Sequence, residues 1–364
     1  MACILKTKKA NLFGSPVKGF PVLIMEDNRV HWLSLNYFLD IYERLSLSSV
    51  ALYAQHIQDL YSQIEVEENY NEVGDIDDSF LRAFKEDIAM RGGMRRESYT
   101  SHVIHSILLY CEWLECNGYC KNLIGDTKNH QIRVKYTDKG RIKHPLAKLS
   151  RNARCSAPRT NWIEIVKQYG PKGDAVHTRF ELMIDWCRTV GLRANEVCSL
   201  KIFQLPSFDS VDKALLESRD LDCPLLITKG NKQDIARVPS LLLKRTWNYI
   251  NVERKELLNS CSKSIPSDSE YIFISKLTRT KLNPTSFSNS VRKAYLSACI
   301  NGELKETERV WTHGLRHNFA VTTIKVFDNS GIKRPESVAR QFTRHSSEQA
   351  LETYLLDRNN LDFI

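Results

Sequence analysis

The sequence predicts a mainly α-helical protein with small β-hairpins, an α+β arrangement spread over more than one domain. The chain has 364 residues, which is enough for two or three domains of ordinary size. Hydrophobic residues make up 42% of the chain and charged residues 26%, so it can form packed cores and is neither disordered nor fibrous. Apolar residues recur at helical spacing over most of the length, and only short runs have the character of strands.

Residues 1–45 are expected to form a small separate element, a β-hairpin followed by a helix. The apolar run 20–25 and the alternating run 29–34 flank residues 26–28, a Glu-Asp-Asn sequence that is typical of a hairpin turn. A short helix over about 36–45 is expected to follow. The element is interpreted either as a structural cap on the next domain or as a binding arm.

Residues 46–126 are expected to form an all-α domain of three helices. The first helix begins near Ser48 or Ser49, the second at 75–78 and the third near Ser98, and each carries apolar residues at helical spacing. This spacing predicts a compact helical unit with a core of its own.

Residues 127–160 stand out as a basic interdomain linker. Ten basic residues and a single acid, Asp138, lie between residues 128 and 159, so this segment accounts for the net charge of +9 and the rest of the chain is balanced. Pro145 and Pro158 argue against regular structure there. Charge concentrated in one segment indicates a polyanionic partner.

Several classes of protein are excluded by what the sequence does not contain. No run of about 18 apolar residues predicts a membrane span, and the basic start of the chain has no apolar region of a signal peptide. Ten cysteines without regular spacing predict a reducing, cytoplasmic location, and the tightest cluster, Cys111, Cys116 and Cys120, is expected to consist of buried thiols rather than a metal site. Residues 170–174 lack the spacing of a phosphate-binding loop.

Residues 161–364 are expected to form a larger, mostly helical domain with one hairpin, 225–228 paired with 235–238. Within it, Gly191 is a natural end for a helix, and Arg193 then stands at the start of the next one, where its guanidinium can fork onto a phosphate. Glu196, one turn later, can brace that guanidinium. Alone, such a pair is usually a surface ion pair.

Four further groups follow in order along this domain. A turn in the hairpin carries Lys229, and His313 and Arg316 share one helix face at a spacing of three. Tyr354 lies nine positions after His345. Taken singly, each has an ordinary structural explanation, such as a solvated lysine or a packed tyrosine.

Together and in this order, the groups closely resemble the tyrosine recombinase (phage integrase) family. The family pattern is Arg, Lys on a hairpin, His-x-x-Arg, His or Trp, then Tyr, and the flanking sequences Gly-Leu-Arg-x-x-Glu, His-x-Leu-Arg-His-x-Phe-Ala and His-Ser-Ser match as well. The resemblance covers the catalytic domain over 161–364 and extends to 46–126 as a core-binding domain, with 97–113 as its DNA-facing helix. The catalytic set that it implies is Arg193, Lys229, His313, Arg316, His345 and Tyr354, with Glu196 in support.

The resemblance implies a site-specific DNA recombinase that works without metal or other cofactor. Tyr354 would attack a DNA phosphodiester to form a 3′-phosphotyrosyl link, and Lys229 would protonate the leaving 5′ oxygen. Arg193 and Arg316 would clamp the non-bridging oxygens.

The two histidines complete this implied mechanism. His313 would accept the tyrosine proton, and His345 would hydrogen-bond the phosphate. The sequence departs from the family at Arg344, which stands in place of a glycine, so the local turn is expected to differ and Arg344 becomes a candidate for contact with DNA. The hairpin is about two residues longer than usual, which leaves Lys229 and Lys232 as alternatives for the acid.

The expected partner is double-stranded DNA with specific recombination sites. The protein is expected to be a monomer or dimer when free and a homotetramer on DNA, associated with the nucleoid and open to accessory DNA-bending factors. Residues 1–45 would then be a DNA-binding arm if they are not a cap. The residues expected to contact DNA are Arg95, Arg96, Lys128, Arg133, Lys135, Lys139, Arg141, Lys143, Lys232 and Arg344.

Integration or excision of a mobile genetic element is the reaction favoured by the resemblance. A type IB topoisomerase would use the same chemistry without strand exchange, but the two-domain layout disfavours it. A DNA-binding regulator without catalysis is the third interpretation, and the complete set of six residues argues against it.

Overall fold

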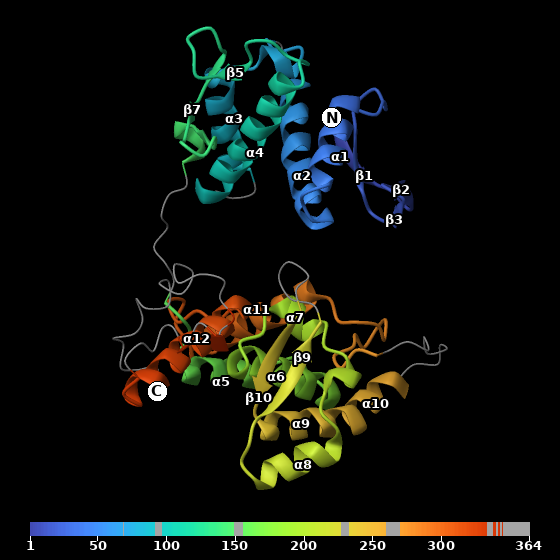
Figure 1. Cartoon of the computed structure of the whole chain (residues 1–364), viewed down its shortest axis with the longest axis vertical. Helices are drawn as coiled ribbons and strands as arrows, with labels where there is room; N and C mark the ends of the chain where they lie inside the picture. Colours follow the sequence, from blue (N-terminus) through green and yellow to red (C-terminus); the bar gives the residue numbers. More distant parts are fainter. Residues whose placement is uncertain are drawn as a thin grey trace. The chain divides into compact units, whose positions relative to one another are not determined.

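A computed structural model describes residues 1–67, 69–91, 97–148, 156–226, 233–259, 270–332, 338–339, 341–342 and 344. Its contacts divide the chain into two compact units, Met1–Ala153 and Arg154–Ile364 (Figure 1). Each unit has a hydrophobic core of its own.

The first unit opens with two small antiparallel sheets and a helix. The strands are β1 (Cys3–Lys6) with β4 (Pro21–Ile24) and β2 (Ala10–Leu12) with β3 (Ser15–Val17), and the helix is α1 (Trp32–Tyr42). The predicted turn over 26–28 is present, since the backbone N–H of Asn28 donates to the carbonyl of Met25 at 2.9 Å.

The prediction that residues 20–25 pair with residues 29–34 is wrong. Residues 29–34 form no strand beyond a single bridge between Val30 and Ile24, and β1 at the start of the chain pairs with β4 instead. The helix begins early because the ring of His31 accepts the backbone N–H of Ser34 at 3.2 Å and so caps it.

Three helices follow, as the apolar spacing predicts. They are α2 (Leu47–Ile64), α3 (Asp78–Met90) and α4 (Glu97–Cys116), with a short 3₁₀ turn η1 (Val73–Asp75) before α3. The start of α2 is capped by Ser46 and not by the expected Ser48 or Ser49, and α3 is capped by Asp77, whose carboxylate accepts the N–H of Phe80 at 2.8 Å. Phe20 and Phe38 of the N-terminal element lie in one core with these helices.

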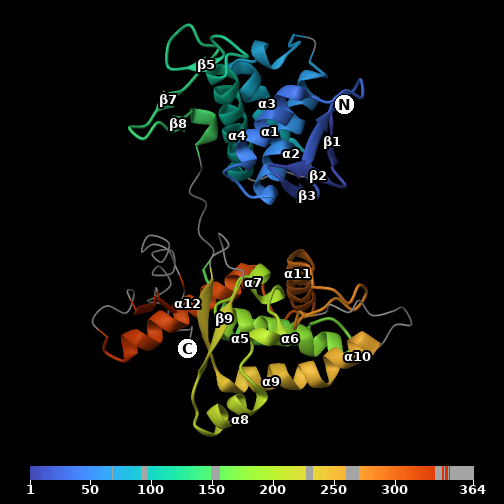
Figure 2. The same ribbon diagram turned by 45° about the vertical axis from the view of Figure 1, so that its right-hand side comes forward.

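The segment after α4 contains short regular elements, so the expectation of an irregular linker over 127–160 is wrong for its first half. They are the parallel pair β5 (Ile124–Gly125) and β6 (Ile132–Arg133), the antiparallel pair β7 (Lys135–Tyr136) and β8 (Ile142–Lys143), and the 3₁₀ turn η2 (Pro145–Ala147). Ile132, Val134 and Ile142 are buried in the core of the first unit. Pro145 opens η2, a position that needs no backbone N–H. In both views the β7–β8 hairpin lies across the helices from the β1–β4 sheet (Figure 2).

The second unit is mostly helical. Its elements are α5 (Thr160–Gln168), α6 (Asp174–Thr189), α7 (Ala194–Cys198), η3 (Ile202–Gln204), α8 (Phe208–Leu216), β9 (Leu221–Leu225), β10 (Asp234–Val238), α9 (Ser240–Asn251), α10 (Glu253–Asn259), α11 (Pro284–Ile300) and α12 (Thr312–Asn329). Helix α6 contacts α9, α10 and α12 and carries the fully buried Trp186, whose indole N–H donates to Thr246 at 3.0 Å. The core of this unit therefore surrounds α6.

The hairpin predicted for this unit forms, with its first strand earlier than predicted. Strand β9 ends at Leu225 instead of beginning there, and Leu225 pairs with Asp234. Cys223 and Leu225 are buried, and Pro224 between them is exposed, as the alternation of a strand requires. The prediction missed this strand because it followed the more apolar run 225–228. None of the described helices is long and apolar enough to cross a membrane.

Candidate active site

A left-handed turn after α6 is the base of the site. Gly191 has φ of 68°, as expected of a glycine that follows a helix. A Cβ at this position would meet the ring of Phe319 at 2.4 Å, so both the conformation and the close contact require glycine. The turn fixes the direction of the Gly191 carbonyl and places Arg193 at the N-cap position of α7.

The predicted brace between Glu196 and Arg193 is present. One carboxylate oxygen of Glu196 accepts the Arg193 Nη1–H at 2.7 Å, and the other accepts the backbone N–H of Arg193 at 2.9 Å. The Glu196 side chain is buried, whereas that of Arg193 is 30% exposed. Glu196 therefore holds one edge of the Arg193 guanidinium, and another part of this group is exposed to solvent.

Helix α12 brings a second arginine to the same turn. Arg316 is completely buried, and its Nη1–H donates to the carbonyl of Gly191. His313, one turn earlier on the same helix, is exposed, and its ring lies 4.8 Å from that of His317. Burial, together with the charges of His313 and Arg316, lowers the pKa of His317 to about 4, so His317 is neutral near pH 7.

Arg344 is the third arginine of this cluster. It stands at φ of 55°, a left-handed conformation that glycine adopts more readily, and its side chain is only 9% exposed. Its Nη2–H donates to the carbonyl of Gly191 at 3.1 Å and lies 3.4 Å from Glu196. Burial lowers the pKa of Arg344, and the charges of Glu196 and Asp234 oppose that shift.

The structure therefore brings four of the predicted residues together: Arg193, Glu196, Arg316 and Arg344. The Gly191 carbonyl accepts from Arg316 and Arg344, and the Glu196 carboxylate contacts Arg193 and Arg344, so three guanidinium groups gather at one turn. Such a cluster can bind the charged oxygens of a phosphoryl group, and the negative charge that develops on them in the transition state, through short charge-assisted hydrogen bonds.

His313 is exposed on α12, one turn before Arg316, and is not part of this cluster; the other predicted site residues fall into two groups. Lys229, Lys232, His345, Tyr354, Arg95 and Arg96 lie outside the described residues. The basic residues Lys128, Arg133, Lys135, Lys139, Arg141 and Lys143 belong to the first unit, and all six are exposed.

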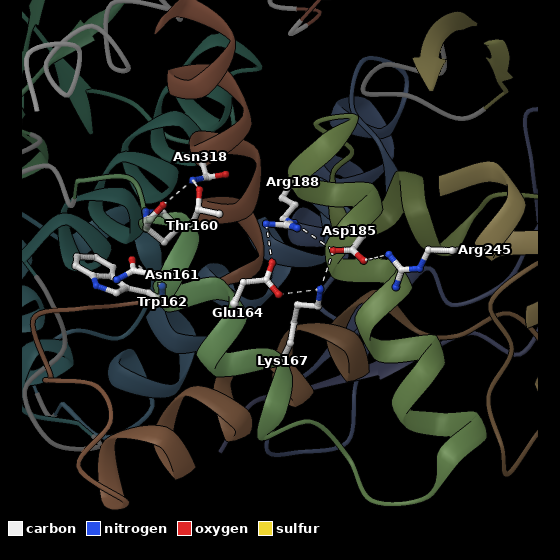
Figure 3. Close-up of polar contacts among 10 residues, drawn as sticks. Thr160, Asn161, Trp162, Glu164, Lys167, Asp185, Arg188, Arg245 and Asn318 are labelled. Atoms are coloured by element: carbon white, nitrogen blue, oxygen red, sulfur yellow. Dashed lines mark hydrogen bonds and ion pairs between the residues drawn. The ribbon is translucent and has the colours of Figure 1, made fainter. Parts of the chain in front are cut away.

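An ion network around the buried Asp185, which sequence reasoning missed, supports the helix that leads to this turn (Figure 3). Asp185 on α6 accepts from Lys167 at 3.1 Å, from Arg188 at 3.1 Å and from Arg245 at 2.7 Å, while Glu164 bonds Lys167 and Arg188. Only 3% of Asp185 is exposed. The network ties α5 and α9 to α6, and the apolar spacing of α6 gave no signal for it.

Helix α12 is tied to the start of α5 by one side chain. The amide of Asn318 donates to the carbonyl of Pro158 at 3.0 Å and lies 3.4 Å from the hydroxyl of Thr160 (Figure 3). Because Asn318 lies two residues after Arg316, this contact fixes the part of α12 that carries the site.

A comparison of the sequence with family models identifies the family. Residues 164–355, more than half of the chain, match the model described as Phage integrase family. The chain belongs to this family. The assignment to the tyrosine recombinases from the motif order is thereby confirmed, and so is the enzyme class, a site-specific recombinase. No curated protein matches the chain.

Solved structures of recombinases share the fold of this phage integrase family member. The XerH site-specific recombinase, in a post-cleavage complex with palindromic difH substrate, aligns with a TM-score of 0.57 at 14% identity over 92% of this chain and 87% of that one. A lambda integrase dimer bound to a COC′ core site aligns with a TM-score of 0.58 at 16% identity over 91% and 96%. The Tn1549 transposon integrase in complex with circular intermediate DNA gives 0.51 at 12% identity over 88% and 94%. These likenesses confirm the predicted fold class, mainly helical with small sheets.

Proposed function

We propose that this protein cuts and rejoins DNA at specific sites through a 3′-phosphotyrosyl intermediate, with Tyr354 as the nucleophile. The observation that carries the proposal is the meeting of Arg193 and Arg316 at the Gly191 turn, in a member of the phage integrase family. The two arginines come from different helices, and their convergence gives a phosphoryl group the charge it needs in the transition state.

Each proposed step has a donor and an acceptor. The Tyr354 oxygen attacks phosphorus and passes its proton to His313, and the bond from phosphorus to the 5′ oxygen breaks as that oxygen takes a proton from Lys229 or Lys232. His345 donates a hydrogen bond to the phosphate. Rejoining is the reverse reaction with a new 5′ hydroxyl, so the bond energy is conserved in the phosphotyrosine.

A basic ribbon in the first unit is proposed as part of the DNA interface. We define it by the exposed residues Arg133, Lys135, Lys139, Arg141 and Lys143. Arg133, Lys135, Arg141 and Lys143 alternate with the buried Ile132, Val134 and Ile142, so these cations face outward while the opposite side packs in the core, and Lys139 lies in the turn between β7 and β8. Strand β6 and the β7–β8 hairpin that follows it thus present a row of exposed cations, which suits contacts with DNA phosphates.

The buried side of this ribbon is also fixed by a polar contact. His144 is buried, and its Nε2 lies 2.9 Å from a carboxylate oxygen of Asp78 at the start of α3. Because Lys143 directly precedes His144, the contact holds the end of the ribbon against the helices. Lys128, Arg95, Arg96 and Lys232 remain proposed DNA contacts through the family resemblance alone.

The domain roles and the assembly are part of the same proposal. Residues 161–364 act as the catalytic domain and 46–126 as the core-binding domain, residues 127–160 join them, and 1–45 act as a cap or arm. The proposed partner is duplex DNA bearing recombination sites, on which four copies assemble with or without DNA-bending factors. The protein would act on a mobile element and be cytoplasmic, at the nucleoid.

The test is covalent capture on a nicked suicide duplex. We expect an SDS-stable adduct that disappears in Tyr354→Phe, because no other group supplies the bond-forming oxygen. Tyr271→Phe is the matched control: its ring lies 5.5 Å from Lys201 Nζ, a contact that phenylalanine keeps, and it should form the adduct normally. Arg193→Ala and Arg316→Ala should slow cleavage by roughly 10²–10³-fold.

The same assay separates the alternatives. An adduct together with exchange of strands between two duplexes supports recombination. An adduct with relaxation of supercoiled DNA and no exchange would indicate a type IB topoisomerase, and binding without any adduct would indicate a regulator. An adduct formed by Tyr354→Phe would disprove the nucleophile assignment.

A further inference from the structure

Arg344 occupies a position where the backbone conformation favours glycine. Its φ of 55° is left-handed, and the motif of the family has a glycine there. A non-glycine residue in this conformation carries a steric cost. An arginine at this position therefore needs a compensating interaction, and its side-chain contacts show where to look for one.

The side chain of Arg344 points to the turn that already holds the other two arginines. Its Nη2–H contacts the carbonyl of Gly191, which also accepts from Arg316, and Glu196, which also holds Arg193. These acceptors lie 153 and 148 residues away in the chain. Arg344 is thus a third cation at the centre of the site and not a surface contact.

The contacts made by Arg344 do not satisfy it. Its Nε and Nη1 are buried and have no hydrogen-bond partner among the residues that the structure describes. The ion pair with Glu196 is long, at 3.4 Å, and the same carboxylate is already bonded twice to Arg193. A buried guanidinium with two unsatisfied donors lowers the stability of the fold. If the side chain only supported the turn, an apolar residue could fill the same space without this cost.

An anion at this place would satisfy the missing bonds and the charge together. Three guanidinium groups meet at the Gly191 turn, where Glu196 is hydrogen-bonded to Arg193 and Arg344 and the charge of Asp234 also acts on Arg344. We propose that Arg344 binds a non-bridging oxygen of the scissile phosphate directly, as a third arginine of the active site, with Gly191 and Glu196 positioning it. This inference rests on the proposed recombinase function, and it adds a phosphate ligand that the family motif does not contain.

The first test removes the guanidinium in two ways. Arg344→Gly restores the glycine that suits the backbone, and Arg344→Met keeps bulk without charge. We expect both to slow single-turnover cleavage of the nicked suicide duplex by about 10²-fold, with Arg344→Lys intermediate because it keeps charge but loses the fork. Wild-type rates in Arg344→Gly and Arg344→Met would overturn the proposal.

A stability control separates folding from chemistry. Arg279 in the same unit is also buried, at 3% exposure, and also left-handed, with φ of 55°. The fall in melting temperature of Arg279→Gly therefore shows what the loss of a buried left-handed arginine does to the fold. Cleavage is compared at a temperature where every variant is folded.

The second test distinguishes a phosphate ligand from a positioning residue. A methylphosphonate at the scissile position removes one charged oxygen, so the rate penalty of Arg344→Gly should shrink at least tenfold on that substrate. In an Arg193→Ala background the penalty on the ordinary phosphodiester should persist, since a residue acting only through Arg193 would have nothing left to position. An equal penalty on both substrates, or its disappearance in that background, would refute direct contact.

The result is separable from the proposed function. If the wild-type protein forms no Tyr354-dependent adduct, the proposed function fails. If it forms the adduct and Arg344→Gly cleaves at the wild-type rate, only the role of Arg344 fails.

Discussion

Replacing Glu196 by glutamine is the sharpest test of the way the site is held. The substitution keeps the shape of the side chain and removes the charge that Arg193 and Arg344 share. One amide oxygen can still accept a hydrogen bond, but the amide nitrogen turns a donor toward groups that are themselves donors. The three contacts at 2.7, 2.9 and 3.4 Å cannot all survive.

The magnitude follows from the burial of the three groups. A hydrogen bond to a charged group contributes about 1.5–3 kcal/mol, and water can replace part of it at Arg193, whose side chain is 30% exposed. We therefore expect a loss of about 2 kcal/mol in the free energy of unfolding, which for a unit of this size corresponds to a fall in melting temperature of about 4–8 °C. Cleavage should slow by roughly 10-fold, less than for Arg193→Ala, because the guanidinium is loosened but not removed.

Thermal melting and single-turnover cleavage of the suicide duplex measure the two effects. The matched control is Glu217→Gln, which removes a carboxylate of similar type whose side chain is 44% exposed and pairs with Arg219. An exposed pair contributes little, so the control should melt within about 1 °C of wild type. A Glu196→Gln protein that melts and cleaves like wild type would refute the view that this carboxylate organises the site.

Three other predictions concern the support of the site and the first unit. Asp185→Asn leaves three cations around a neutral group and should destabilise the second unit by about 2–3 kcal/mol, with a matching fall in melting temperature; an unchanged melting curve would contradict a stabilising network. Neutralising Lys139, Arg141 and Lys143 together should make the salt dependence of DNA binding shallower by about 3 units of slope, and an unchanged slope would show that the ribbon does not meet phosphates. Burial lowers the pKa of His56 to about 4, below its value in the unfolded chain, so its contribution to stability is complete above about pH 6.5 and is lost as the pH falls toward 4. Melting temperatures across that range should fall less steeply in His56→Asn, and parallel curves would count against this assignment.

The helices and the first half of the site could be predicted from the sequence because they depend on neighbours in the chain. A side chain such as Asp77 caps its own helix three residues on, and Glu196 reaches Arg193 across a single turn. The left-handed Gly191 follows from the need to end α6. The family motif likewise lies in short local runs, so its order was visible before any fold.

The convergence of the arginines could not be predicted, because it depends on residues far apart in the chain. Arg316 meets Gly191 across 125 residues, and Asp185 meets Arg245 across 60. Periodicity predicts which face of a helix is buried but not which buried partner it finds, and no local pattern marks a charged side chain that is buried because another helix supplies its counter-ion.

The basic segment after α4 shows the same division. Its charge predicted an exposed, cationic segment, and its proline residues argued against regular structure. The alternation of the buried Ile132, Val134 and Ile142 was therefore missed. Strands of two residues carry too short a pattern to be recognised, and they form here because the core of the first unit buries one of their faces. The sequence by itself thus determined the helical character of both units and the order of the motif. Only the tertiary structure decided which charges meet, because burial and charge pairing between distant residues are properties of the packed chain.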